Sequence, residues 1–285
     1  MTHLEHTLLL PKASSTASSA ELVRSIHSHS SIRGLAIALA ILALWVSSWG
    51  FLFIPHLQIW WVIPAITIRT FLYTGLFITA HDAMHRSLWT GHPEVNDRIG
   101  AIAVFLYAFF DYQKLLKKHR LHHQHPASEL DPDFCAHQNP LLWYFHFLKQ
   151  YCGWSQLLTP IVIFEIIQYL LQVPTIHLIL FWAIPALLSS IQLFYFGTFL
   201  PHREPTGGYH NLHRTQSSSF SIIWSFLTCY HFGYHEEHHQ YPSLPWWQLP
   251  IIYRLRQTMQ GQTPSLHRGL LFRSGYDSAP LGRET

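Results

Sequence analysis

Two histidine clusters determine how this chain can fold: His119-Arg-Leu-His122-His123 and His235-Glu-Glu-His238-His239. A third cluster, His81-Asp-Ala-Met-His85, precedes both of them. The spacings are i,i+4 in the first cluster along the chain and i,i+3,i+4 in the other two. On a helix such residues share one face, so each cluster can aim its imidazoles at a common point. The sequence therefore predicts helical segments whose histidine faces meet.

The composition is typical of a protein that contacts lipid. Of the 285 residues, 49% are hydrophobic and 12% are charged, and 23 are histidine. A soluble domain carries about 25% charged residues. A net charge of +3 with scattered basic residues excludes a nucleic-acid-binding protein. Three cysteines, Cys135, Cys152 and Cys229, predict neither a disulfide framework nor a cysteine metal site.

Four apolar segments are long enough to cross a bilayer as helices, at residues 34–54, 57–80, 157–173 and 176–200. Short turns join them into two hairpins. The stretches Ile99–Phe110 and Phe220–Phe232 are too short to cross, so we expect interfacial or re-entrant helices there. The predicted fold is an all-α, multi-pass integral membrane protein. We expect a mobile tail at residues 1–32, a membrane catalytic domain at 33–256 and a C-terminal tail at 257–285.

The basic residues predict the orientation of this protein in the bilayer. Of the 18 Lys and Arg, three precede the first span, seven lie between the second and third spans, and seven follow the fourth. Cytoplasmic loops carry such an excess of Lys and Arg. Both termini and all three histidine clusters are therefore predicted to face the cytoplasm.

The clusters predict a site for two metal ions, because eight imidazoles exceed what one ion can bind. Imidazole suits iron, copper, zinc and nickel. His202 should emerge with the fourth span at the same face, and we expect it to be a ninth ligand. His231, one turn before His235, is a candidate ligand or a support for a ligand. The predicted metal ligands are His81, His85, His119, His122, His123, His235, His238, His239 and His202.

Carboxylates near the clusters are candidates to orient the rings. A ligating histidine usually donates its second ring N–H to a carboxylate or a carbonyl. A helix cap or a solvated charge is an equally good explanation of each carboxylate. The candidates are Asp82, Asp131, Asp133, Glu236 and Glu237. For the histidines of polar loops, His125, His137, His146, His210 and His213, local hydrogen bonding is the better explanation.

Arg69 and Glu165 are the charged residues deep inside the predicted spans. Counted from the cytoplasmic ends of their helices, their depths differ by only about 4–5 Å. Charged residues in a membrane usually face the bundle interior and find a partner. We therefore expect an Arg69–Glu165 ion pair that joins the two hairpins.

The three clusters resemble the histidine boxes of the membrane fatty-acid desaturase/hydroxylase superfamily. Four longer sequences narrow the resemblance, between about residues 33 and 256, to the carotenoid 4-ketolases. They are Phe71-Leu-Tyr-Thr-Gly-Leu-Phe-Ile, Leu130-Asp-Pro-Asp, Phe194-Tyr-Phe-Gly-Thr-Phe-Leu-Pro-His and Leu227-Thr-Cys-Tyr-His-Phe-Gly-Tyr-His. One departure is Arg86, directly after the first box, where the family pattern leads us to expect glycine.

The resemblance implies two non-haem iron ions bound by the box histidines, with O₂ as co-substrate and an external electron donor such as ferredoxin. It implies that β-carotene enters from the lipid phase. Two hydroxylations at the allylic ring carbon C4, or C4′, followed by loss of water, would give a ketone, with echinenone and then canthaxanthin as products.

Three alternatives remain at this stage. A carotenoid 3-hydroxylase or a fatty-acyl desaturase would use similar boxes. A histidine-rich membrane transporter of metal or haem belongs to a different class, and it should place polar groups along a path through the bilayer. Because the histidines gather at one interface, the sequence favours an enzyme.

Overall fold

The structure is a computed structural model that describes residues 31–54, 56 and 58–262. Helices form all the regular structure of these residues, which confirms the predicted all-α class. Most of both predicted tails, with Lys12, His27 and His29 among their residues, lies outside the described part of the chain.

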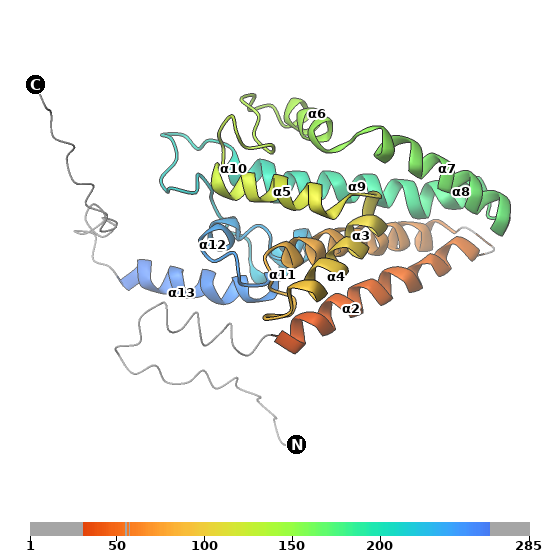
Figure 1. Ribbon diagram of the computed structural model, residues 1–285, viewed down its shortest axis with the longest axis horizontal. Helices are drawn as coiled ribbons and strands as arrows, with labels where there is room; N and C mark the ends of the chain where they lie inside the picture. The colour runs from red at the N-terminus through yellow and green to blue at the C-terminus, as the bar shows by residue number, and fades with distance from the viewer. Residues whose placement is uncertain (1–30, 55, 57, 263–285) are drawn as a thin grey trace, which may run out of the picture.

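Four long helical runs form the body of the molecule. The first consists of α2 (Ser31–Ser47) and the 3-10 turn η1 (Ser48–Phe53), the second is α3 (Ile59–Met84), and the third is α7 (Trp154–Leu171). The fourth joins α8 (Thr175–Leu178), η2 (Ile179–Ala183), α9 (Ile184–Leu193), η3 (Phe194–Phe199) and α10 (Leu200–His202). Each run is long and apolar enough to cross a membrane. Figure 1 shows them extending along the long axis of the molecule.

The segments between and after these runs are shorter helices. They are α4 (Pro93–Ala108), α5 (Tyr112–Gln124), α6 (Pro140–Tyr151), α11 (Ile222–Cys229), α12 (His235–Gln240), η4 (Trp246–Gln248) and α13 (Leu249–Gln262). The two short apolar stretches of the sequence fall mainly in α4 and α11. A bend of 98° separates α4 from α5, and this pair would count as a fifth crossing only if it formed one broken span.

The core between the long helices is largely aromatic. Trp45 of α2 and Tyr73 of α3 meet edge to face with ring centroids 5.5 Å apart, and both are buried. Phe71 of α3 stacks on Tyr230, just beyond α11, at 4.2 Å. These contacts hold α2, α3 and α11 together beneath the histidine-bearing end of the molecule.

The predicted Arg69–Glu165 ion pair is wrong. Arg69 is buried and donates from Nη1 to Ser48 Oγ at 2.7 Å, and its guanidinium lies 5.3 Å from the Trp49 ring centroid. Glu165 is exposed on α7, a helix without a buried residue. The prediction compared only depth along two helices, and depth does not determine which way each side chain faces around its helix axis.

The fourth run contains two π-helical stretches, η2 and η3, in which the helix turns are wider than in an α-helix. Gly197 lies in η3 against Phe232, where an added Cβ would be 3.0 Å from the ring. The second wide stretch ends just before α10, which carries His202.

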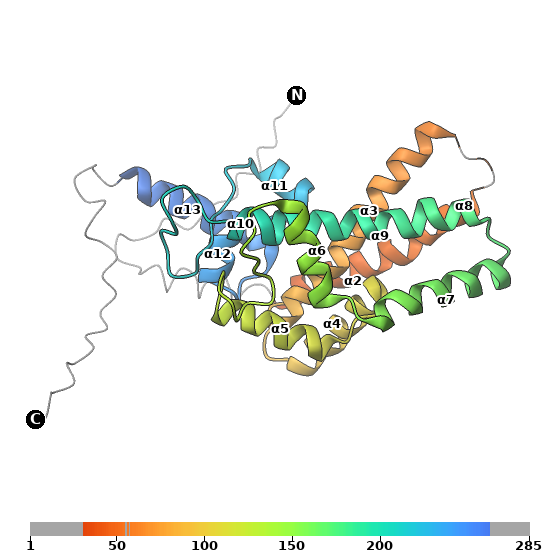
Figure 2. The same ribbon diagram turned by 90° about the horizontal axis from the view of Figure 1, so that it is seen from above.

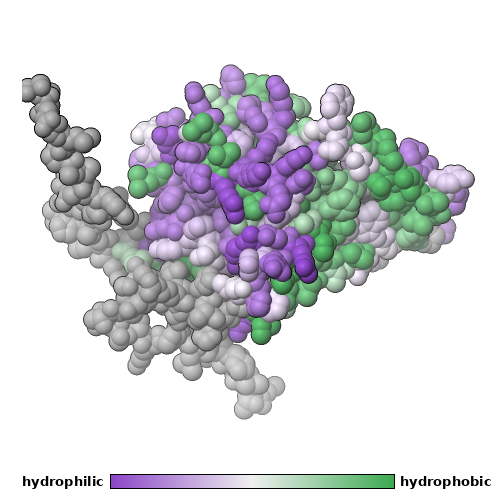
Figure 3. All heavy atoms as spheres, viewed as in Figure 1, coloured by the Kyte–Doolittle hydropathy of each residue, from purple (hydrophilic) through white to green (hydrophobic). Residues whose placement is uncertain are grey.

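The surface of the molecule is divided into a hydrophilic part and a hydrophobic part along its long axis. Figure 3 shows hydrophilic residues over the part of the molecule that contains α5 and mainly hydrophobic residues over the opposite part, towards α7 and α8. In Figure 2, α7 lies apart from the other long helices for most of its length. The division agrees with a bilayer around the hydrophobic part.

Candidate metal centre

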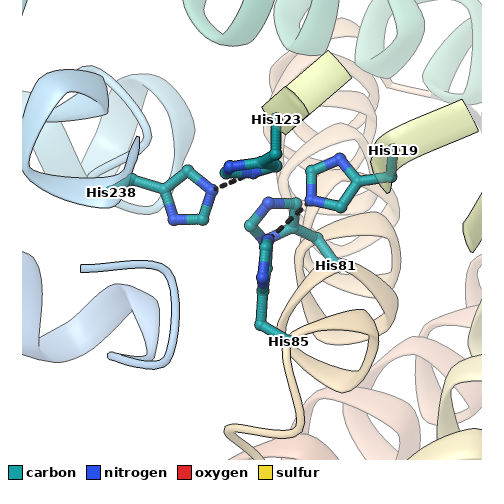
Figure 4. Close-up of side chains that lie close together, drawn as sticks. All are labelled: His81, His85, His119, His123 and His238. Carbon is teal, nitrogen blue, oxygen red and sulfur yellow. Dashed lines mark hydrogen bonds between the residues drawn. The ribbon is translucent and has the colours of Figure 1, made fainter. Parts of the chain in front are cut away.

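The structure brings all nine predicted metal ligands together in two adjacent groups. The first contains His81, His85, His119, His123 and His238, and the second contains His122, His202, His235 and His239. Within each group, one ring nitrogen of every histidine lies within 4.8 Å of the others. Figure 4 shows the rings of the first group converging from three helices.

The i,i+3,i+4 spacing explains how two helices serve both groups. On α5, His119 and His123 enter the first group and His122 enters the second. On α12, His238 belongs to the first group, whereas His235 and His239 belong to the second. The rings of His123 and His239 stack at 4.2 Å between the groups. Two metal ions bound here would therefore be neighbours.

The remaining ligand candidates come from the ends of long helices. His81 lies in the last turn of α3, and His85 is the C-cap residue of that helix. His202 ends α10 and is buried. The predicted span ended at residue 80, just before His81, whereas α3 continues to Met84 and includes His81. The helix itself therefore fixes the direction of the His81 side chain.

The ring nitrogens fit cations. Nε2 atoms face each other in the pairs His85–His119 at 2.6 Å, His123–His238 at 3.0 Å, His202–His235 at 2.9 Å and His122–His239 at 3.1 Å. His122 Nδ1 donates to Asp131 and His202 Nδ1 donates to the Arg214 carbonyl, so both Nε2 atoms present lone pairs to the centre. His81 Nε2 is buried without a partner among the described residues. A cation satisfies converging lone pairs of this kind.

Burial keeps the third histidine cluster neutral. Desolvation lowers the pKa of His235, His238 and His239 well below the ordinary value, and neighbouring imidazoles lower it further. Neutral imidazole is the form that binds a metal.

Three of the predicted carboxylates contact ligand candidates or lie next to them. Asp131 accepts from His122 Nδ1 at 3.0 Å and from the backbone N–H groups of Ala127 and Asp133 at 2.9 and 2.8 Å. Asp133 Oδ2 lies 3.7 Å from His122 Nδ1. Asp82 Oδ1 lies 3.4 Å from His81 Nδ1, and its Oδ2 accepts from the Trp246 N–H at 3.1 Å.

The other candidates have different surroundings. Glu236 and Glu237 bind Arg256 at 2.6 and 2.9 Å and so connect α12 to α13. His231 belongs to neither group, and its ring lies 5.7–5.9 Å from the rings of Phe226, Tyr234 and Trp246. Burial lowers the pKa of His231 to about 4.

One polar neighbour of the centre was not predicted from the sequence. The Tyr151 hydroxyl at the end of α6 donates to Asp133. No local motif identifies Tyr151, because 18 residues separate it from its partner.

Arg86 has the backbone conformation that favours glycine, with φ of 61°. Its side chain donates to the Pro93 carbonyl at 2.8 Å and pairs with Asp97. These contacts hold the chain in the turn that follows the first box.

A cavity of about 270 Å³ ends at the two histidine groups. His81, His119, His122 and His235 border it. Most of the remaining lining is apolar, with Phe77, Met84, Phe110, Leu115, Phe147 and Leu193 among its residues. Leu187 and Ser190 of α9 lie at its less buried side, on a helix that can span the membrane. The cavity thus connects the centre to the hydrophobic part of the molecule.

The chain is similar in sequence to several known proteins. The family model for fatty acid desaturases matches residues 148–269. A beta-carotene ketolase from Paracoccus sp. (strain PC1) is 44% identical over 191 residues, which cover 66% of this chain and 76% of that protein. A beta-carotene ketolase from Haematococcus lacustris is 41% identical over 70% of this chain and 63% of its own length.

A more extended match is the zeaxanthin 4-ketolase of Chlamydomonas reinhardtii, which is 38% identical over 81% of this chain and 55% of its own length. Taken with the 44% identity to a Paracoccus enzyme of which 76% is covered, these matches show that the chain belongs to the beta-carotene ketolase family.

Proposed function

We propose that this protein is a β-carotene 4-ketolase that uses two iron ions and O₂. The observation that carries the proposal is the position of two adjacent imidazole groups at the end of an apolar cavity. Each hydroxylation at C4 inserts one oxygen atom of O₂ and reduces the other to water, with two electrons and two protons. Two hydroxylations at one carbon give a gem-diol, and loss of water leaves the ketone.

The two histidine groups would each hold one iron ion, and bound iron would supply the activation of O₂ that imidazole and carboxylate side chains cannot provide. Asp131 keeps the His122 Nδ1 protonated and so directs its Nε2 to the centre. The carbonyl of Arg214 does the same for His202.

The cavity is suited to one end ring of a long apolar substrate. Sites that enclose a whole drug-sized ligand measure about 300–1,000 Å³. A cavity of about 270 Å³ with a largely apolar lining would bind the ring and exclude water, while the polyene extends past Leu187 and Ser190 towards lipid. The C4 carbon would then face His81, His119, His122 and His235.

The proposed orientation places both termini and the centre at the cytoplasmic face. The excess of basic residues outside the two short hairpin turns supports it. A ferredoxin or a similar carrier in the cytoplasm would deliver the electrons.

Expression in a host that accumulates β-carotene, followed by chromatography and mass spectrometry of the pigments, tests the proposal. We expect echinenone and canthaxanthin, and we expect both to be lost in His122→Ala. The matched control is His210→Ala, because His210 is exposed and belongs to neither group. Zeaxanthin as the product would favour a 3-hydroxylase, and new double bonds in acyl chains would favour a desaturase. Iron or haem uptake without pigment change would favour a transporter.

A further inference from the structure

A second hollow lies beside the centre and does not belong to the substrate cavity. It measures about 630 Å³ and is bordered by α5, α6 and the segment at residues 129–137. One side of α6 borders the first cavity with Phe147 and Tyr151, while His146 and Gln150 of the same helix border the hollow. Helix α6 therefore separates the two spaces.

At the bottom of the hollow, a single side chain lies between the hollow and a predicted metal ligand. Asp131 borders the hollow, is only 5% exposed and accepts a hydrogen bond from His122 at 3.0 Å. His122 is in turn one of the four histidines of the second group. A redox group held in the hollow would thus be connected to the centre through Asp131 and His122.

The outer face of α5, next to the hollow, is basic, whereas the lining of the hollow itself carries Lys118 together with the carboxylates Glu129 and Asp131. Lys118 borders it, and Lys114, Lys117 and Arg120 are exposed on the same helix, away from the face that carries His119 and His123. Lys149 is exposed on α6. Within the described part of the chain, none of these five basic side chains forms an ion pair. Glu129 is the exposed acidic residue at the rim.

Apolar side chains are exposed in the hollow, next to this basic face. Leu121 of α5 is 42% exposed and Leu130 is 65% exposed, and both border the hollow. A charged rim around an apolar centre is the usual composition of a protein–protein contact, and charge complementarity accelerates the encounter.

We infer that an acidic protein electron carrier docks on this hollow and on the outer face of α5. The inference rests on the proposed function, which requires two electrons from outside the chain for each oxygen insertion. Two one-electron carriers would be oxidised in turn, and the electrons, with two protons, reduce one oxygen atom of O₂ to water. The carrier and the carotenoid would then approach the centre from different sides of α6.

The test uses full-length protein in nanodiscs of zwitterionic lipid and a plant-type [2Fe–2S] ferredoxin as the probe. The variant Lys114→Gln/Lys117→Gln/Arg120→Gln is expected to raise the KM and the Kd for ferredoxin about tenfold, since three charge pairs across the contact are lost. The iron content and the rate with a small uncharged reductant should stay unchanged. The matched control is Arg98→Gln/Arg203→Gln/Arg254→Gln, which removes three exposed basic side chains elsewhere.

A second variant, Leu130→Glu, places a negative charge inside the apolar part of the surface and should weaken ferredoxin binding at least as much. The inference is overturned if the control variant has the same effect, or if activity with the small reductant falls in parallel. It is also overturned if the α5 variant differs from wild type only in nanodiscs of anionic lipid, because the basic face would then bind headgroups. Failure of the wild type to form ketone with any reductant would contradict the proposed function instead, while the Kd would still test docking.

Discussion

At the scale of single residues, Asp131 fixes the position of one ligand candidate of the centre, His122. Its two oxygens receive hydrogen bonds from the His122 ring and from two backbone N–H groups. The backbone contacts hold the carboxylate still, and the carboxylate then fixes both the tautomer and the direction of the ring. Asp131 is therefore a positioning residue for His122.

We predict that Asp131→Asn weakens iron binding by about 10- to 100-fold, the range found when the hydrogen-bond partner of a ligating histidine is removed. An amide presents one oxygen where the carboxylate presents two. Metal analysis after dialysis against graded chelator concentrations measures the effect. Glu236→Gln is the control, since Glu236 binds Arg256 and no ligand candidate. Equal iron retention by both variants would contradict this role.

His231→Phe is predicted to leave the iron content unchanged and to reduce the sensitivity of the fold to acid. Burial lowers the pKa of His231 to about 4, whereas an unfolded histidine has a pKa of about 6.5. The unfolded chain therefore binds more protons between these values, and stability is lost as the pH falls from about 6.5 towards 4. Thermal midpoints of variant and wild type, compared at pH about 7 and about 5, test this, and iron loss in His231→Phe would make His231 a ligand.

Among elements, hydropathy predicted the four long helices to within a few residues, because length and apolarity suffice to define them. The histidine spacing likewise predicted which side chains meet. Sequence could not predict how α5 and α12 divide their histidines between two groups, since that depends on how the helices cross. The proposed relation of His231 to His235 assumed one continuous helix, but Tyr230 and His231 have left-handed φ angles of 46° and 61° that separate α11 from α12.

The contact between η1 and α3 gives a prediction for Ser48. Ser48→Ala should lower the free energy of unfolding by about 1.5–3 kcal/mol, because it removes a hydrogen bond to a buried charged group. Ser47→Ala is a matched control, as Ser47 is exposed and adjacent. Thermal inactivation of both variants in detergent gives the comparison. A midpoint for Ser48→Ala as high as that of Ser47→Ala would show that Arg69 does not need this partner.

For the whole molecule, the division into hydrophilic and hydrophobic parts gives each face of the fold a different environment. The exposed side chains of α7 include Leu157, Ile161 and Leu170, which suits a helix surrounded by lipid. The histidine groups lie at the hydrophilic part, so the proposed orientation brings the centre close to soluble carriers. The substrate cavity borders the hydrophobic part.

The proposed topology predicts opposite accessibility for two exposed positions. In a variant with Cys135, Cys152 and Cys229 replaced by serine, Gln172→Cys lies at the turn between α7 and α8, and Glu204→Cys lies just after α10. A membrane-impermeant maleimide added to intact cells should label the first cysteine, and the second should be labelled only after lysis. Labelling of both in intact cells would place the ends of the fourth helical run on the same side.

The wide turns of η3 set the direction in which the following residues of the fourth helical run face. An α-helix with the same number of residues would turn those residues in a different direction. Each residue of an α-helix advances the rotation by about 100°. If these six residues, Phe194–Phe199, formed α-helical turns with no change in their number, His202 would therefore swing about a quarter of a revolution away from His235. The wide stretch thus accommodates one residue more than an α-helix of the same rotation, and it is this extra residue that leaves His202 facing His235.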